Sequence, residues 1–347
     1  MNEGQVAQTI AALGEFGLIS RLTAELASRP DVLVGVGDDC AVLDLSGEQV
    51  LLATCDSLLD GEHFLRAVAT PEQIGRHAMA VNLSDIASMG GAPRYALVSL
   101  LLPTDLPITF MDGVYRGLRL EAERYGAVII GGNITRSPGS LGIDITLLGQ
   151  ARRAAVLLRS GAQPGDALLV TGWLGEAAAG LQLLLHPELA APSPVAERLK
   201  LAQLVPVPRV PEGRVLADLG VVTAMLDVSD GLAADLGHLC EQSGVGARLD
   251  EASLPIHDAT RQAAQLAGQR ALDWALFGGE DYQLLFTAPP AAVSHIRELL
   301  LITTGTMVSV IGEILPADAG LILRASDGSS RPLAARGWDH LRSVAGQ

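Results

Sequence analysis

Residues 49–56 read QVLLATCD, an apolar run that ends on Asp56. Residues 70–73, TPEQ, then open a helix with a capping-box pattern and a proline at its first position. We expect that helix to continue to Gly90-Gly91. A buried strand that ends on a carboxylate and is followed by a helix is typical of open α/β sheets, which bind their ligands at strand ends.

The same alternation of strand-like and helix-like patterns continues along the chain. A boundary near residues 151–159 separates two α/β halves, so we expect one domain over residues 1–152 and a second over 153–347. The proline-rich residues 187–211 predict an irregular excursion inside the second half. Strands are predicted over 95–102, 127–130 (buried), 141–149, 166–171, 221–226 and 282–287, and helices over 107–125, 176–185, 230–242 and 290–301.

Composition limits the class of protein. The 347 residues are long for one core and suit two domains, and 49% hydrophobic residues are ample material to bury. The formal net charge of −15 argues against nucleic acid or an anionic membrane as a partner, because both require basic surface. Cys40, Cys55 and Cys240 form no CxxC pair, so we expect a reducing, cytoplasmic location. We expect neither a signal peptide nor a transmembrane helix.

Six acidic or near-acidic clusters recur along the chain, each beside glycine, serine or a strand end. Carboxylates that converged on one spot would repel each other unless hard cations lay between them. Mg²⁺ bound by few protein oxygens also brings substrate phosphates into its remaining positions, so the pattern indicates a polyphosphate site built through Mg²⁺. The clusters are Gly37-Asp38-Asp39, Cys55-Asp56, Asn82-Leu83-Ser84-Asp85, Gly131-Gly132-Asn133, Asp227-Val228-Ser229-Asp230-Gly231 and Gly278-Gly279-Glu280-Asp281.

Lys200 is the only lysine in the chain. A Walker loop ending in Gly-Lys-Ser/Thr and the strand lysine of protein kinases are therefore both excluded. The charge of a bound phosphate must be met by metal, arginine and backbone amides instead.

Each cluster alone has a simpler explanation. Paired aspartates after Gly37 are typical of a solvated turn, and GGED at residues 278–281 is compatible with a hairpin turn. The position of Asp85 favours a functional role over a structural one, because a carboxylate near the negative end of a helix dipole is unfavourable without a cation. Glycine-rich turns after strands, as at residues 131–133 and around Ser229, favour phosphate through exposed amides and the positive end of a following helix.

Taken together, in order and spacing, the motifs resemble the thiamine-monophosphate kinase family of the aminoimidazole ribonucleotide synthetase superfamily. The resemblance covers the whole chain. It implies a two-domain, layered α/β (α+β) fold in which the N-terminal domains pair in a homodimer and ATP lies in the cleft between the domains. The matching segments are residues 14–19 (GEFGLI), 37–41 (GDDCA), 61–64 (GEHF), 80–90 (AVNLSDIASMG), 227–232 (DVSDGL), 278–282 (GGEDY) and 337–340 (GWDH).

The resemblance also implies a role for each matching site residue. Cys55 replaces a usual threonine, so only its carbonyl can serve as a ligand, and Asn133 stands where most members have aspartate, so it supplies no charge. Without the resemblance, His63 would be read as a surface side chain and Trp338 as an anchor in the core. The implied Mg²⁺ ligands are Asp38, Asp39, Thr54, Cys55, Asp56, Asp85, Asn133, Asp227 and Asp230; the ATP contacts are Gly132, Asn133, Arg159 and Ser229; the thiamine monophosphate contacts are His63, Glu280 and Trp338.

The reaction that the resemblance implies is direct in-line transfer of the γ-phosphoryl group of ATP to thiamine monophosphate, giving thiamine diphosphate and ADP. Several Mg²⁺ ions would offset the repulsion between the two anions, and no general base is needed because the acceptor phosphate is already a nucleophile.

Two alternatives stay open. One is another ATP-using enzyme of the superfamily, although selenium or carbamoyl chemistry would lead us to expect a reactive terminal cysteine that this chain lacks. The other is a weakly active regulator that binds nucleotide or thiamine phosphate, suggested by Cys55 and Asn133.

Overall fold

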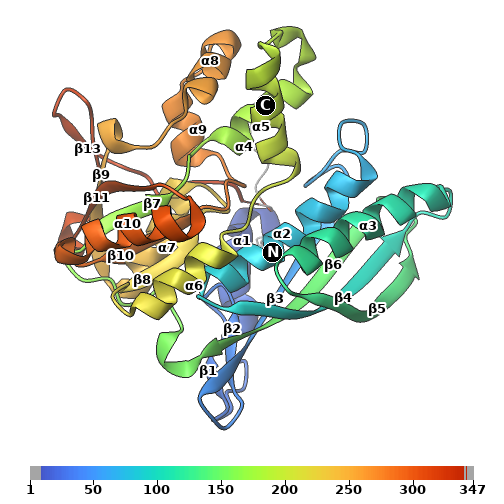
Figure 1. Cartoon of the computed structure of the whole chain (residues 1–347), viewed down its shortest axis with the longest axis horizontal. Helices are drawn as coiled ribbons and strands as arrows, with labels where there is room; N and C mark the ends of the chain where they lie inside the picture. The colour runs from blue at the N-terminus through green and yellow to red at the C-terminus, as the bar shows by residue number, and fades with distance from the viewer. Residues whose placement is uncertain (1–8, 340, 342–347) are drawn as a thin grey trace, which may run out of the picture.

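The computed structural model describes residues 9–339 and 341. They form two sheets, each covered by helices, and Figure 1 shows the first sheet on the right of the molecule and the second on the left. The first sheet ends at Arg152 and the second begins at Ala167. The division into domains at residues 152 and 153 stays a prediction.

The first sheet has the strand order β1-β2-β3-β6-β4-β5, and its neighbours pair antiparallel except β4 with β5. Helices α2 (Pro71–Ser88) and α3 (Ile108–Arg124) lie across one face, and α1 (Ile10–Thr23) precedes β1. The strands are β1 (Val32–Val34), β2 (Ala41–Asp44), β3 (Gln49–Leu59), β4 (Ala92–Leu102), β5 (Val128–Arg136) and β6 (Gly142–Arg152).

Helix α2 begins as its sequence predicts. The Gln73 side chain accepts from the Thr70 N–H at 2.9 Å and the Thr70 hydroxyl accepts from the Gln73 N–H, so the capping box is confirmed. Gly75 allows α3 to touch α2, because a Cβ there would lie 2.0 Å from the carbonyl oxygen of Val114. This contact fixes α2, whose last turns carry Ser84 and Asp85.

The other face of the first sheet is apolar and uncovered by any described helix of the chain. The predicted buried strand over residues 127–130 is wrong in this respect: β5 is longer and forms an exposed edge strand. The reason is that the apolar residues of a strand alternate between two faces, and only one face meets α2 and α3. We call this surface the open apolar face; it includes Leu59, Tyr95, Leu97, Leu101, Val128 and Ile130.

The second sheet has the strand order β13-β12-β9-β11-β7-β10-β8, and its neighbours pair antiparallel except β12 with β9. Its strands are β7 (Ala167–Thr171), β8 (Ala224–Asp227), β9 (Val245–Asp250), β10 (Leu284–Ala288), β11 (Val308–Pro316), β12 (Leu321–Arg324) and β13 (Ser330–Pro332). Its helices are α4 (Glu176–Leu185), α5 (Ser193–Leu204), α6 (Val210–Leu219), α7 (Leu232–Ser243), α8 (Asp258–Ala267), α9 (Ala271–Phe277) and α10 (Val293–Thr304).

Helices cover both faces of this second sheet. Leu168 and Val170 of β7 pack into one core with residues of α4, α5, α7, α8 and α9, whereas Leu169 packs into a second core with α6 and α10. All five residues of β7 are therefore buried, and the continuous apolar run in the sequence is explained.

The expectation of an irregular excursion over residues 187–211 is wrong. This segment contains α5 and the start of α6, with a short 3₁₀ helix at Pro187–Leu189. Pro194 and Pro211 lie in the first turns of their helices, where the missing N–H costs no intrahelical bond. Proline density therefore marked helix starts here rather than a loop.

The two units pack directly against each other through α2 and α6. A Cβ at Gly213 of α6 would lie 2.0 Å from the carbonyl oxygen of Ala87, so glycine is needed for this approach. The contact brings the end of α2 to the edge of the second sheet. Among the described helices, none has both the length and the apolar character needed to span a bilayer.

Candidate functional site

Three carboxylates from different elements converge where the two units meet. Asp39 lies in the loop before β2, Asp85 in the last turn of α2, and Asp227 at the end of β8. One oxygen of each lies within 4.8 Å of the others. Asp227 is 2% exposed and Asp39 is 8% exposed, and Oδ2 of Asp39 has no hydrogen-bond partner among the described residues.

These carboxylates disfavour one another's charge. Burial and the charge of Asp39 raise the pKa of Asp227 to about 8. Burial, together with the charges of Asp56, Asp227 and Asp39, raises the pKa of Asp85 well above its usual range. Burial and Asp39 also raise the pKa of the adjacent Asp38 to about 6. Hard cations would remove this repulsion, so the donor set fits Mg²⁺.

Arg159 is a cation of the chain itself that lies in this group. Its Nε donates to Oδ1 of Asp39 at 2.9 Å, and its backbone N–H donates to Oδ2 of Asp38 at 3.2 Å. Burial would lower the pKa of Arg159, but the ion pair with Asp39 outweighs burial and raises it. The predicted ATP contact therefore lies beside the predicted metal ligands.

Two hydroxyl groups orient the carboxylates. The Thr54 hydroxyl donates to Oδ2 of Asp85, and the Ser84 hydroxyl donates to Oδ2 of Asp227. Ser84 was not expected to act in the site. Its signal in the sequence is its position beside Asp85 on a buried stretch of helix, which turns a polar side chain into the interior.

The alternation of β3 separates Cys55 from its neighbours. Thr54 reaches the carboxylate group, and the charge of Asp56 also acts on Asp85. Cys55 points to the opposite, open face, where its Sγ lies 3.6 Å from Oδ1 of Asp144. Because the thiol faces away, only the carbonyl of Cys55 could serve the site, and that role stays a prediction.

The turn between β8 and α7 carries Ser229 and Asp230. A buried carboxylate, Asp235, shapes this turn by accepting from the N–H of Asp230 at 3.2 Å and of Gly231 at 3.0 Å. Asp235 was not predicted, although an aspartate four residues after a turn glycine is a recognisable capping signal. The N–H of Trp338 donates to the carbonyl of Asp230 at 3.0 Å, which brings the C-terminal motif to the site.

Glu280 lies beside this turn, with its N–H donating to the carbonyl of Ser229 at 2.7 Å. Burial would raise the pKa of Glu280, but the neighbouring His77, the hydrogen bond from Gln203 and the charge of His63 together outweigh burial and lower the pKa. His63 and Glu280 are thus within electrostatic reach of each other. His63 is partly buried, and its Nδ1 accepts from the Leu59 N–H at 3.1 Å.

Asp281 has a separate, structural role. Its carboxylate accepts from the N–H of Gly175 at 2.5 Å and of Ala177 at 3.2 Å, at the start of α4. It therefore caps α4 and does not join the other carboxylates.

Comparison with known proteins identifies the family. Residues 37–151 match the family described as AIR synthase related protein, N-terminal domain, and residues 163–323 match the corresponding C-terminal domain. The chain is 38% identical to the thiamine-monophosphate kinase of Escherichia coli (strain K12) over 330 residues, covering 95% of this chain and 98% of the relative. The chain belongs to the thiamine-monophosphate kinase family. It is 32% identical to the Bacillus subtilis (strain 168) member over 331 residues, covering 95% of this chain and 100% of that protein.

Solved structures agree with this family. AaThiL complexed with AMPPCP and TMP is similar with a TM-score of 0.84 and 34% identity, covering 97% of this chain and 100% of that one. The hydrogenase maturation protein HypE of E. coli, at 24% identity and a TM-score of 0.69, shares the fold. The predicted two-domain fold of the aminoimidazole ribonucleotide synthetase type is therefore confirmed.

Some residues that the thiamine-monophosphate kinase resemblance implies are not brought together within one chain. Gly132 and Asn133 lie on β5, which is separated from β3 by β6 and β4, a distance of about 14 Å at ordinary strand spacing. Asn133 pairs with Ser99 on the sheet edge. Its role in metal or ATP binding stays a prediction. His340 of the C-terminal motif lies outside the described residues.

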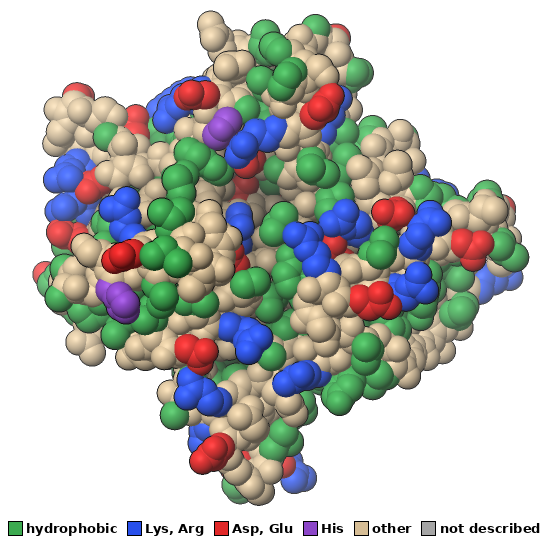
Figure 2. All heavy atoms as spheres, in the orientation of Figure 1, with side chains coloured by type: hydrophobic (Ala, Val, Ile, Leu, Met, Phe, Trp, Pro, Cys, Tyr) green, Lys and Arg blue, Asp and Glu red, His purple; other side chains and the backbone are tan. Residues whose placement is uncertain are grey.

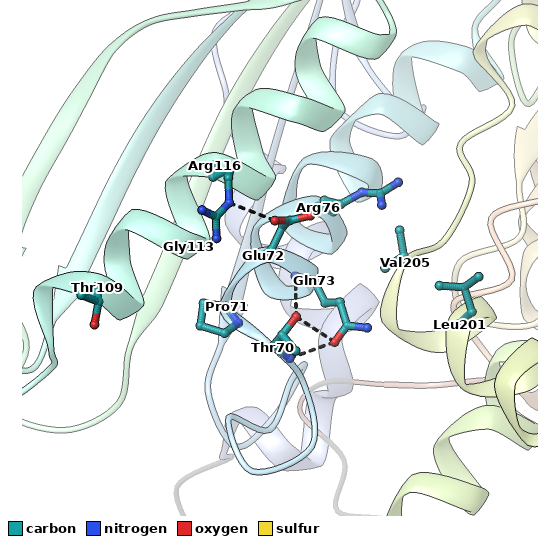
Figure 3. Close-up of a pocket in the computed structure, with 10 residues that line it drawn as sticks. All are labelled: Thr70, Pro71, Glu72, Gln73, Arg76, Thr109, Gly113, Arg116, Leu201 and Val205. Carbon is teal, nitrogen blue, oxygen red and sulfur yellow. Dashed lines mark hydrogen bonds and ion pairs between the residues drawn. The ribbon is translucent and has the colours of Figure 1, made fainter.

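Two adjoining cavities, of about 420 and 330 Å³, lie between α2 and α3 on one side and α5 on the other. Figure 3 shows Arg116 reaching Glu72 across the first cavity, while Arg76 extends toward Leu201 and Val205. In Figure 2 basic and acidic side chains alternate over this side of the molecule. Ion pairs between helices thus line the cavities, and the three converging carboxylates lie elsewhere.

Proposed function

We propose that this chain transfers the γ-phosphoryl group of ATP to the phosphate of thiamine monophosphate, giving thiamine diphosphate and ADP. The observation that carries the proposal is the convergence of Asp39, Asp85 and Asp227 between the two units. It is supported by similarity, over nearly the whole chain, to AaThiL complexed with AMPPCP and TMP.

Mg²⁺ is the cofactor that this donor set fits best. Asp39, Asp85 and Asp227 would hold it, with Asp38, Asp56 and Asp230 nearby and with oxygens of Thr54 and Cys55. Metal ions bound there would neutralise charge on the ATP and acceptor phosphates. The unpartnered Oδ2 of Asp39 and the raised pKa values of Asp85 and Asp227 support this assignment.

The side chains and amides of the protein would position the two substrates. Arg159 and the backbone at Ser229, before the N-terminus of α7, suit the phosphates of ATP. His63, Glu280 and Trp338 suit the acceptor: the histidine can hold phosphate, and a carboxylate and a flat aromatic ring suit the cationic ring of thiamine. No general base is needed, because the acceptor phosphate is already a nucleophile.

We also infer a homodimer that pairs through the open apolar face. Ile130 is 56% exposed, Tyr95 46% and Leu97 40%, and such an apolar surface marks a protein interface. Leu97→Asp should then convert a dimer to a monomer in light scattering coupled to gel filtration. Ile302→Asp on α10 is the matched control, since Ile302 is 73% exposed and lies on the other unit. A monomeric wild type would contradict the proposal.

The role of Gly132 and Asn133 depends on the proposed dimer, and the proposed location depends on the cysteines. Gly132 and Asn133 are proposed to contact ATP and metal in the dimer, where β5 faces a second chain. A cytoplasmic location is supported by the three free thiols, of which Cys40 and Cys240 are buried.

Incubation with ATP, Mg²⁺ and thiamine monophosphate, followed by chromatography, tests the activity. We expect thiamine diphosphate and ADP in equal amounts, and at least about a hundredfold less product from Asp85→Asn. Single-turnover transfer from labelled ATP separates the alternatives. Binding of both ligands without transfer would favour a regulator, and transfer of label to a different acceptor would favour another enzyme of the superfamily.

A further inference from the structure

The Glu280 carboxylate is held from two sides by side chains of different units. His77 Nε2, on α2 over the first sheet, lies 3.3 Å from Oε1 of Glu280. Gln203 Nε2, on α5 beside the second sheet, donates to Oε2. Each oxygen of the Glu280 carboxylate therefore has one side-chain partner. The two contacts form together only when the two units pack against each other.

The two supports are buried while the carboxylate remains accessible. The His77 side chain is 4% exposed and Gln203 is 5% exposed, whereas the Glu280 side chain is 28% exposed. The His77 ring also packs edge-on against Tyr282, with ring centroids 6.3 Å apart. A rigid, buried setting behind a partly exposed carboxylate is what a recognition group requires.

The backbone around Glu280 is held in an uncommon conformation. Glu280 has φ +66° and Tyr282 has φ +47°, in the left-handed region that non-glycine residues rarely adopt. Two backbone bonds hold it: the N–H of Glu280 donates to Ser229 and that of Tyr282 to Val228. A Cβ at Gly279 would lie 2.5 Å from the Ser229 carbonyl oxygen, so the preceding residue must be glycine. Strain of this kind concentrates at functional sites.

We infer that His77 is a positioning residue for the acceptor substrate: together with Gln203 it fixes the carboxylate of Glu280 in the orientation that recognises thiamine monophosphate. The inference rests on the proposed function, because it takes Glu280 as an acceptor contact. His77 touches Glu280 and not the carboxylates of the metal group, so its effect falls on the acceptor rather than on ATP. Neither His77 nor Gln203 belongs to the motif positions that predicted the site.

A pair of substitutions separates positioning from packing. His77→Gln keeps an N–H donor close to the position of Nε2, and His77→Met keeps the volume without a donor. We expect His77→Met to weaken thiamine monophosphate binding on the order of tenfold, measured by titration calorimetry and as KM, because the 3.3 Å ion-pair contact of His77 with the Glu280 carboxylate is lost. His77→Gln should stay within about threefold of wild type, and KM for ATP should not change in either variant.

A double-mutant cycle completes the test. In a Glu280→Gln background, His77→Met should cause no further loss of thiamine monophosphate affinity, because His77 acts through Glu280. The inference is overturned if His77→Met binds both substrates like wild type. It is also overturned if both His77 variants lose affinity for both substrates together with a lower Tm.

The binding measurement keeps the inference separate from the proposed function. If wild type binds thiamine monophosphate but forms no thiamine diphosphate, the proposed reaction fails while the comparison of the His77 variants still decides the inference. If wild type does not bind thiamine monophosphate, both are overturned.

Discussion

The hydroxyl of Ser84 on α2 donates a hydrogen bond to Oδ2 of Asp227 at the end of β8. The two residues are 143 positions apart, and Ser84 belongs to the first unit while Asp227 belongs to the second. The bond orients a buried carboxylate of the candidate metal site and at the same time joins the two units. We therefore predict that metal binding and the docking of the units are coupled through this pair of side chains.

Ser84→Ala tests this coupling. Loss of a hydrogen bond to a charged group should lower the free energy of unfolding by about 1.5–3 kcal/mol. The Mg²⁺ concentration for half-maximal activity should rise about tenfold or more, because the ligand loses its orienting partner. Urea denaturation and a Mg²⁺ titration measure both. Ser88→Ala is the control, since Ser88 is equally buried on α2 but donates to a backbone carbonyl. Equal effects of the two variants would contradict the coupling.

Asp85→Asn should reduce turnover at least about a hundredfold, because the site loses a charged ligand for the metal ions. Without metal the same change should raise the Tm, since repulsion with Asp56, Asp227 and Asp39 is relieved. Steady-state kinetics and thermal unfolding in EDTA measure the two effects. Asp218→Asn, at an exposed aspartate, should change neither. Near-normal activity of Asp85→Asn would remove Asp85 from the site.

Stability without metal should fall as the pH rises. Folding raises the pKa of Asp38 to about 6 and of Asp227 to about 8, above the unfolded value of about 4. The folded state thus binds more protons between these values, so the contribution of these groups is full below about pH 4 and is lost through pH 6 and 8. Unfolding in EDTA at pH 5 to 9 measures the fall. Asp227→Asn should flatten this fall in stability, and saturating Mg²⁺ should reverse it. The assignment would be contradicted if wild type in EDTA, Asp227→Asn in EDTA and wild type with Mg²⁺ gave the same dependence of stability on pH.

Trp338→Ala should weaken thiamine monophosphate binding about tenfold with little change for ATP, because a cation–π contact at a partly desolvated site is lost. Trp338→Phe keeps a flat ring and should retain most of the affinity. Titration calorimetry with each ligand measures this. An equal loss for both ligands, or a large drop in Tm, would mark Trp338 as a structural anchor.

Asn133→Asp should lower the Mg²⁺ concentration for half-maximal activity, because a carboxylate adds charge beside the metal. KM for thiamine monophosphate should not change. Since β5 lies three strands from β3, we expect this gain in the dimer and not in the monomeric Leu97→Asp background. A gain that persists in the monomer would contradict the dimer as its origin, and no gain in either would leave Asn133 outside the metal site.

Much of the fold could be predicted from local pattern. The helix capped by Thr70 and Gln73, the helix over residues 176–185 and the apolar strand before Thr171 all follow from periodicity and end signals. The strand over residues 127–130 was predicted correctly but its burial was not, and the irregular segment over 187–211 was predicted wrongly. Burial of a strand depends on what covers it, and prolines in the first turn of a helix resemble prolines in a loop.

The sequence by itself determined the family, the chemistry of the acidic clusters and the absence of any lysine-based phosphate loop, because these depend on residue types and their spacing. Only the tertiary structure decided which clusters meet. It brought together Asp39, Asp85 and Asp227 and turned Cys55 to the far face of β3. It also placed the Asp281 carboxylate where it caps the start of α4. It also placed His77 against Glu280. The physical reason is that strand alternation and the docking of α2 on the second sheet select each side chain's neighbours, and the local sequence does not contain that information.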